Sequence, residues 1–148
     1  TNIVKSEKFS ELIQGAMNRY LNGMLTNEEV IQELLKLAKE IADANAEGEK
    51  LGLTADELAF YDALSKPQAI KDFYEHDELI DITKELTDLL SKNRTIDWQK
   101  KESARAGMRR LVKRLLKKHK YPPDGMDDAV QTVMSQCEMW TDNMEVPA

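Results

Sequence analysis

The sequence predicts an all-α protein: a compact single-domain bundle of about six helices, irregular rather than a regular four-helix bundle. Apolar residues recur at spacings of three and four along most of the chain, which is the period of an amphipathic helix. No segment alternates apolar and polar residues as a half-buried strand would. Only six of the 148 residues are Gly, and that length suffices for one domain with a hydrophobic core.

Two helices are expected in the first fifty residues. The first covers residues 6–21, where seven apolar residues follow helical spacing, and it ends at Asn22-Gly23, a pair suited to a left-handed cap. Thr26 and Glu29 match a capping box, so the second helix begins directly after Thr26.

The region after the second helix is the weakest linker of the chain. Residues 45–53 contain Gly48 and Gly52, and this composition would let the first two helices swing. We therefore divide the chain into an N-terminal helical pair, residues 1–52, and a helical core, residues 53–148, within one folded domain.

Three further helices are expected before residue 94. Thr54 and Glu57 form a second capping box, which opens a short helix. Pro67 suits the first position of the next short helix, residues 68–74. A firmer helix covers residues 77–91, where leucine and isoleucine recur at helical spacing.

The segment from Arg94 to Lys120 carries a concentrated positive charge. It holds eleven Lys and Arg against two acidic residues, a net charge of +9, so the rest of this −6 chain carries −15. Read as a helix, its apolar residues fall on one side, and the helix must end before Pro122. The opposite side, our candidate DNA-binding set, consists of Arg109, Arg110, Lys113, Arg114, Lys117, Lys118 and Lys120.

Two interpretations of this basic side remain open. It is either a solvated surface whose cations are neutralised by the chain's own acidic helices, or a surface that contacts phosphates or an acidic partner. No aromatic residues interleave with the charges, which disfavours stacking on single-stranded nucleic acid.

A final helix is expected from Met126 to Trp140, with Asp124 as a possible cap. We expect residues 146–148 to form a disordered tail. The chain begins with Thr1, so we interpret it as a piece of a longer protein or a processed one.

The sequence offers little reactive chemistry. It contains no P-loop, CxxC or HExxH motif, and we expect no catalytic residue, metal site or cofactor in this chain. His76 is interpreted as part of a hydrated helix start, His119 as a contact to a helix C-terminus, and the single cysteine, Cys137, as a buried side chain. No apolar run approaches the length of a membrane span. This favours a binding or assembly module over an enzyme.

Several ordered motifs resemble the C-terminal region of the restriction (motor) subunit of type I restriction-modification enzymes. The resemblance covers Leu53 to Cys137, and the first fifty residues match only loosely. The motifs are LTADELAFYDAL (53–64), IDW (96–98), ARAGMRR (104–110), KRLL (113–116) and YPPD (121–124).

The resemblance implies a context. Such a subunit carries a nuclease domain and two helicase-like domains, uses ATP and Mg²⁺ elsewhere in its chain, and works in the bacterial cytoplasm. It implies the methyltransferase and specificity subunits and duplex DNA as partners. The motor and nuclease motifs are absent here, so we expect a non-catalytic domain for assembly with non-sequence-specific DNA contacts. The alternatives are a protein-docking module without DNA contact and, third, an enzyme in its own right.

Individual motif residues receive structural or interface roles. We expect Trp98 to anchor the core first and an interface second. Arg105 lies near the apolar edge of its helix, so we expect it to pair with a carboxylate from another helix, such as Asp62 or Glu57. Gly107 weakens a helix by about 1 kcal/mol relative to alanine, and a close approach by another helix or a partner would explain it.

The corner formed by Tyr121, Pro122 and Pro123 is expected to be rigid and extended, and to orient the last helix. It could equally be a docking surface, because it presents an aromatic side chain beside a fixed backbone.

Overall fold

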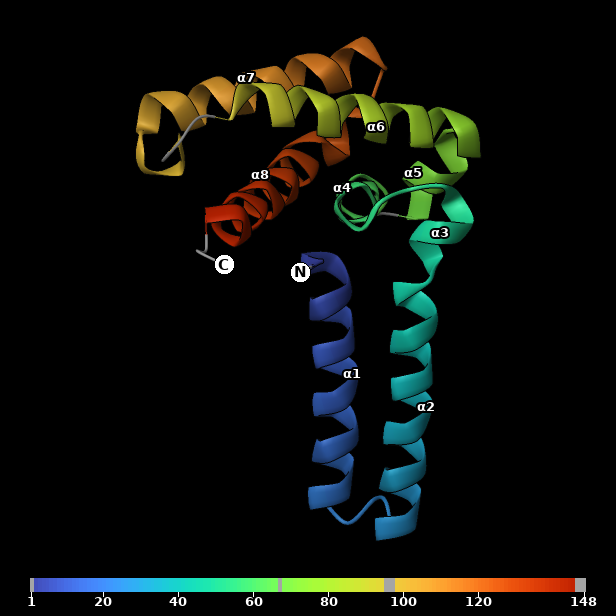
Figure 1. Cartoon of the computed structure of the whole chain (residues 1–148). Coiled ribbons are helices and arrows are strands. Elements are labelled where there is room, and N and C mark those ends of the chain that lie inside the picture. The colour runs from blue at the N-terminus through green and yellow to red at the C-terminus, as the bar shows by residue number, and fades with distance from the viewer. Residues whose placement is uncertain (1, 67, 95–97, 146–148) are drawn as a thin grey trace.

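The computed structural model describes residues 2–66, 68–94 and 98–145, and within them the chain is helical throughout (Figure 1). It contains eight α-helices and one 3₁₀ helix, with no strand in these described ranges. Two of the α-helices, α3 and α5, have only five and six residues, so six longer helices form the body of the fold. The prediction of an irregular all-α protein is confirmed.

The first two helices form an antiparallel hairpin that projects from the rest of the molecule, and we call it the arm (Figure 1). It consists of α1 (Ile3–Leu21) and α2 (Asn27–Asn45). Gly23 adopts a left-handed φ of +75° after α1, and Thr26 caps α2 in a complete capping box with Glu29, both as predicted.

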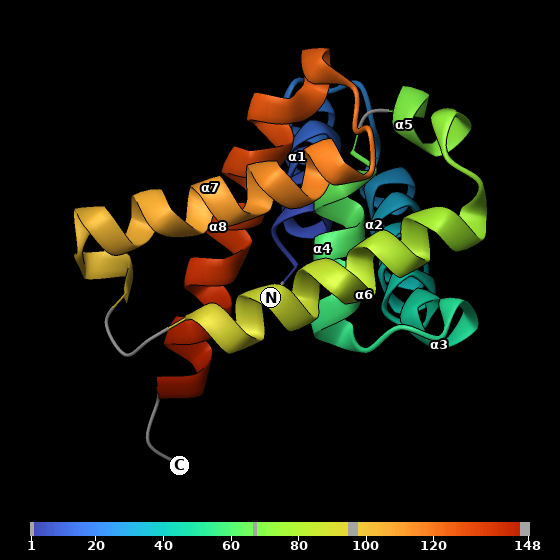
Figure 2. The ribbon, with the colours of Figure 1, turned by 90° about the horizontal axis from the view of Figure 1, so that it is seen from above.

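The remaining long helices pack into what we call the head. Helices α6 (His76–Asn93) and α7 (Glu102–Lys118) lie across the top, with α4 (Ala55–Leu64) and α8 (Pro123–Glu145) beneath them (Figures 1 and 2). The short α5 (Gln68–Phe73) connects α4 to α6. All of α4 from Leu58 onward is buried, so α4 lies at the centre of the head.

Trp98 and Tyr121 fasten the outer helices to this core. Trp98 opens the 3₁₀ helix η1 (Trp98–Lys100), is fully buried, and donates its indole N–H to Thr141 Oγ1 at 2.9 Å. The hydroxyl of Tyr121 donates to the carbonyl oxygen of Leu64 at 2.7 Å, which ties the α7–α8 corner to α4. The prediction that Trp98 is a core anchor is confirmed.

The expected linker between arm and head is a helix. Residues Glu47–Leu51 form α3, and Gly48 is buried against the chain that follows. A Cβ atom at Gly48 would lie 3.0 Å from the carbonyl oxygen of Leu53, a tight contact that glycine avoids. A helix over Glu47–Leu51 thus takes the place of the irregular linker expected within 45–53, and the expected swing of the first two helices stays a prediction.

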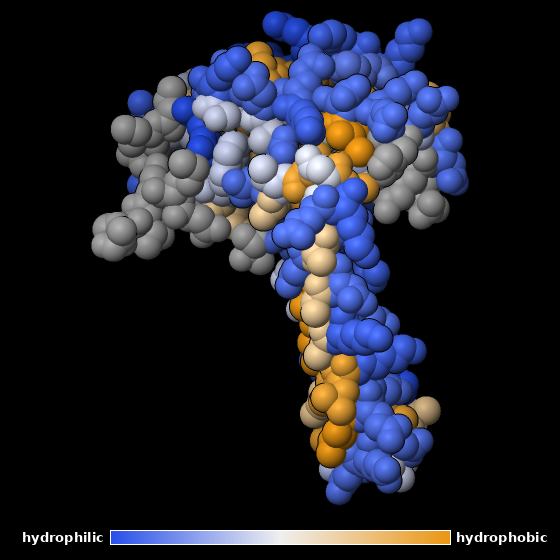
Figure 3. All heavy atoms as spheres, turned by 45° about the vertical axis from the view of Figure 1, so that its right-hand side comes forward, coloured by the Kyte–Doolittle hydropathy of each residue, from blue (hydrophilic) through white to orange (hydrophobic). Residues whose placement is uncertain are grey.

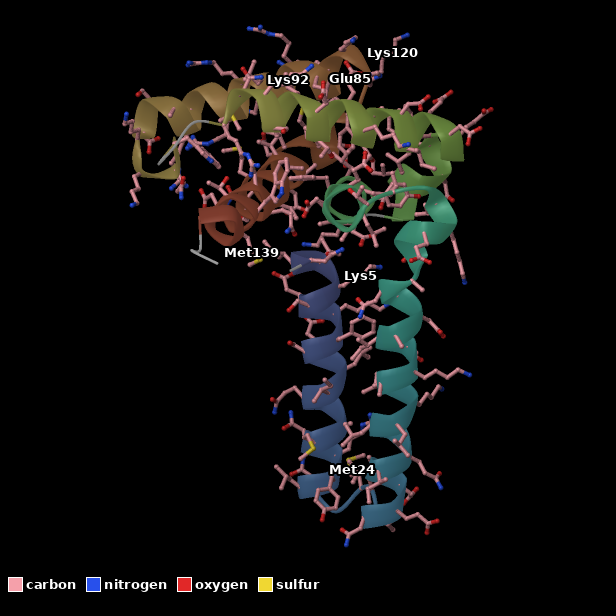
Figure 4. The ribbon with its side chains drawn as sticks, viewed as in Figure 1. Lys5, Met24, Glu85, Lys92, Lys120 and Met139 are labelled. Atoms are coloured by element: carbon pink, nitrogen blue, oxygen red, sulfur yellow. The ribbon has the colours of Figure 1, made fainter. Side chains whose placement is uncertain are left out.

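A partly buried ion pair also joins the arm to the head through the first turn of α1. The ammonium of Lys5, at the end of α1 nearest the head, lies 3.3 Å from Asp62 and 2.7 Å from Glu47 (Figure 4). Asn2 donates to Asp62 at 2.7 Å, and the backbone N–H of Ile3 donates to the side-chain oxygen of Gln136 at 2.9 Å. The arm is thus attached to both α4 and α8.

Two predicted boundaries differ from those observed. The basic segment is not one helix from its start, because η1 and Lys101 precede α7. The last helix begins at Pro123, since proline suits the first helical position, so Asp124 lies in the first turn and is not the cap. Pro67, Asp97 and the tail 146–148 lie outside the described residues.

Candidate interaction surface on helix α7

Helix α7 separates apolar and cationic side chains as the sequence predicted. Met108, Val112, Leu115 and Leu116 are buried, and Leu111 is half-buried at the edge. We call the outward-pointing set the basic face. Its members are all exposed except Arg109, which is half-buried: Arg109, Arg110, Lys113, Arg114, Lys117, Lys118 and Lys120.

Three cations of the basic face lie near carboxylates of the same chain. Arg109 Nη2 is 3.4 Å from Glu102, and Lys113 Nζ is 3.6 Å from Asp127. The side chains of Glu102 and Asp127 are 82% and 94% exposed, so solvent screens both pairs strongly. These two contacts leave their cations largely available to a partner.

The third pair is tighter and joins α7 to α6. Glu85 accepts a hydrogen bond from Lys118 Nζ at 2.8 Å and lies 2.8 Å from the Nε2 atom of His119 (Figure 4). The hydrogen bonds from Lys118 and then His119 hold the pKa of Glu85 below its usual value. His119 is the C-cap residue of α7, and its ring contacts the carboxylate of Glu85.

The other four cations form no ion pair with the described residues. They are Arg110, Arg114, Lys117 and Lys120. Lys120 has a φ of +59°, which turns the chain at the end of α7, and its side chain points away from the head (Figure 4). Within the described residues, the chain's own carboxylates therefore neutralise the basic face only in part.

Arg105 does not meet the partners expected from the sequence. Its guanidinium lies 3.1 Å from Glu138 of α8 and 3.3 Å from the carbonyl oxygen of Gln99. Asp62 is instead occupied by Asn2 and Lys5, on the side of α4 that faces the arm. The expectation that Arg105 pairs with a carboxylate of another helix is confirmed, but that carboxylate is Glu138 and not one of the two examples named.

Gly107 lines an open groove and not a tight helix contact. Among the described residues, a Cβ atom there would meet nothing closer than Arg110 Nη2, at 4.0 Å. Of the two explanations expected for Gly107, close approach by another helix is therefore not found among these residues, and approach by a partner stays a prediction. The groove holds about 380 Å³, and its lining residues include Asn93, Ala104, Gly107, Arg110, Leu111 and Arg114.

A second groove lies at the other end of α7, beside the Tyr121-Pro122-Pro123 corner. It holds about 550 Å³ and is lined by Lys113, Lys117, Lys120, Tyr121, Pro123, Met126 and Asp127. Burial raises the pKa of Tyr121 to about 12, so its hydroxyl remains a donor to Leu64. Tyr121 itself is almost fully buried, and Pro123 is exposed beside it.

The described residues contain no cluster of three or more His, Cys, Asp or Glu that would hold a metal ion. Cys137 is buried, as predicted, and burial raises the pKa of its thiol to about 12, which makes it inert near neutral pH. The side chain of His76 lies outside the described set. None of the helices described has the length and apolar character of a membrane-spanning segment.

The sequence located the basic face but neither groove. Each groove depends on how α7 packs against α6 or α8, and helical spacing within α7 does not contain that information. The unexplained Gly107 was the one sequence signal that pointed to a groove.

Comparison with known proteins shows that the chain is similar to one part of longer enzyme subunits. Residues 1–143 match a family model described as type I restriction enzyme HindI endonuclease subunit-like, C-terminal. The chain is 45% identical over 138 residues to the type I restriction enzyme HindI endonuclease subunit of Haemophilus influenzae, covering 93% of this chain and 13% of that protein. It is 36% identical over 118 residues to a protein of Methanocaldococcus jannaschii described as a putative MjaIXP type I restriction enzyme endonuclease subunit, covering 79% and 11%. No solved structure matches the chain at a significant level.

Proposed function

This chain belongs to the family of C-terminal regions of type I restriction enzyme endonuclease subunits, and on that premise we propose that it is a non-catalytic assembly domain. In this proposal it joins the endonuclease subunit to the methyltransferase and specificity subunits and adds basic contacts to duplex DNA. ATP and Mg²⁺ would act elsewhere in the complete subunit, because the chain spans only about an eighth of the length of its curated relatives.

The observation that carries the DNA contact is the row of exposed cations on α7. Arg110, Arg114, Lys117 and Lys120 form no ion pair with the described residues, and all four lie on one rigid helix or directly after it. Cations on one side of a rigid rod suit a phosphate backbone, and each neutralised phosphate releases counterions and adds salt-dependent affinity. The chain's overall charge of −6 limits this attraction to the local surface.

The alternative is a docking module without direct DNA contact. The two grooves beside α7 support it, because both combine apolar side chains with cations. A phosphate backbone gains little from an apolar floor, whereas an acidic protein surface uses both features.

The test changes the four unpaired cations Arg110, Arg114, Lys117 and Lys120 to Gln in the complete endonuclease subunit. Affinity for duplex DNA is then measured across a range of salt concentrations. Each phosphate contact contributes roughly −0.9 to the slope of log K against log salt. If all four cations contact phosphates, the slope of the variant should therefore be less steep by about 3 to 4. The matched control changes Lys8, Lys36, Lys39 and Lys50, which are exposed and distant from α7, to Gln.

The control should leave the slope unchanged, because it removes the same charge from the arm and α3. An unchanged slope in the α7 variant would remove the DNA contact from the proposal. If that variant instead loses binding to the methyltransferase and specificity subunits, the docking alternative is favoured.

A further inference from the structure

Gly107 occupies a position where no contact with the described residues requires glycine. A Cβ atom there would have ordinary space, with Arg110 Nη2 at 4.0 Å as its nearest neighbour. Its backbone is helical, so no positive φ requires glycine either. Gly48 is the opposite case, because a Cβ atom there would lie 3.0 Å from a backbone oxygen. Glycine weakens a helix interior relative to alanine, and no contact among the described residues offsets that cost at position 107.

The surroundings of Gly107 define the chemistry of what approaches it. Ala104, Gly107 and Leu111 are half-buried and lie at i, i+3 and i+7, so they form one apolar strip along the floor of the 380 Å³ groove. Arg110 and Arg114 line the same groove, and neither forms an ion pair with the described residues. The floor fits an apolar ridge, and the two guanidinium groups fit carboxylates beside that ridge.

Duplex DNA does not satisfy both features at once. Phosphates would engage the arginines but leave the apolar strip without a partner. An amphipathic helix with carboxylates flanking its apolar ridge engages both, and two helices come closest where one of them carries glycine.

We propose that this groove, defined by Ala104, Gly107, Leu111, Arg110 and Arg114, binds an acidic amphipathic helix of the methyltransferase–specificity complex. The helix backbone crosses α7 at Gly107, and its carboxylates pair with Arg110 and Arg114. This inference rests on the assembly role proposed above and names the surface and the kind of segment that carry it. It assigns Arg110 and Arg114 to the protein partner, so that Lys117 and Lys120 are the unpaired cations left for DNA, and the salt slope measured above would then change by about half of the value for four contacts.

The experiment places side chains into the groove without disturbing the fold. Gly107→Ala and Gly107→Leu are made in the complete endonuclease subunit, and affinity for the purified methyltransferase–specificity complex is measured by titration calorimetry. We expect Gly107→Ala to weaken binding about tenfold and Gly107→Leu by more, because each added group holds the two helices apart. The melting temperature of the 148-residue chain should stay equal or rise in Gly107→Ala.

Gly15→Ala is the matched control, because Gly15 is also a glycine inside a helix but lies on the arm. A Cβ atom added at Gly15 would meet no other atom within 4 Å. This variant should leave the affinity unchanged. A second variant, Arg110→Glu with Arg114→Glu, should weaken binding and reduce its dependence on salt.

The outcomes separate this inference from the proposed function. Full affinity in Gly107→Leu overturns the groove while leaving the assembly role intact. A loss of DNA affinity without loss of binding to the methyltransferase–specificity complex also overturns it and assigns the groove to DNA. If the wild-type subunit fails to bind that complex, the assembly role itself fails, and the groove proposal fails with it.

Discussion

The arm and the head are built from helices of similar amphipathic pattern, yet they bury their apolar residues to very different extents. In the head, Phe60, Leu86 and Leu116 are fully buried. In the arm, Leu21 is 74% exposed and Leu35 is 65% exposed. Figure 3 shows the consequence as an apolar stripe that runs along the arm.

This difference in burial comes from the number of helices that pack against each helix. A helix in a two-helix hairpin can bury only the strip that faces its partner, so α2 has one buried residue, Val30. Helix α4 has α6 above it and α8 beside it, and seven of its ten residues are buried. The arm instead relies on local devices, such as the Thr26 capping box and the two hydrogen bonds between Arg19 and Glu33 at 2.9 and 2.7 Å.

The largest expected effect tests this contrast directly. Trp98→Ala should lower the free energy of unfolding by about 3 to 5 kcal/mol, because it opens a cavity in the core and leaves Thr141 Oγ1 without its indole donor. Leu35→Ala in the arm should change it by no more than about 0.5 kcal/mol, since Leu35 is mostly exposed. Urea unfolding measures both. If both variants lose the same free energy of unfolding, the arm and the head are equally well packed, which would contradict the structure.

A smaller effect is expected at the junction of the two regions. Asp62→Ala should cost about 1 to 3 kcal/mol, because it removes the acceptor of Asn2 and one partner of Lys5 in a partly buried site. Hydrogen exchange should then be faster at the backbone N–H groups of the first turn of α1, such as that of Lys5. Asp62→Asn keeps an acceptor for Asn2 and is the control.

The shifted pKa of Asp62 also predicts how its contribution to folding stability changes with pH. Burial raises the pKa of Asp62, despite the opposing hydrogen bond from Asn2 and the charge of Lys5. The folded protein therefore binds its proton more tightly than the unfolded chain, whose pKa is 3.8. Relative to Asp62→Asn, the wild type should lose stability as pH rises from about 3.8 through the raised pKa. A gain over that interval would show that pairing outweighs burial.

The smallest effect concerns the link between α6 and α7. Glu85→Gln should cost less than about 1 kcal/mol, because the Glu85 side chain is 39% exposed and its pair with Lys118 is screened. Since hydrogen bonds from Lys118 and His119 lower the pKa of Glu85, its contribution is present above 4.5 and is lost as pH falls through the lowered value. The melting temperatures of the wild type and the variant should therefore become equal at acidic pH. A constant difference across pH would contradict the pairing.

The sequence by itself determined the helices and the basic face. Helical spacing and capping boxes are local, so Thr26 with Glu29 and Thr54 with Glu57 located two helix starts correctly. The same periodicity placed the cations of α7 opposite its leucines, and six of the seven are exposed. It also identified Trp98 as a core residue from its size and position.

Only the tertiary structure decided which groups meet across helices. Arg105 pairs with Glu138, far along the chain, and no local pattern distinguishes that carboxylate from Asp62 or Glu57. Residues Glu47–Leu51 form α3, where Glu47 pairs with Lys5 and Gly48 lies against the carbonyl oxygen of Leu53. Gly107 lines a groove together with Asn93, the last residue of α6. Ion-pair partners and grooves depend on helix packing, which long-range contacts establish and which helical periodicity does not encode.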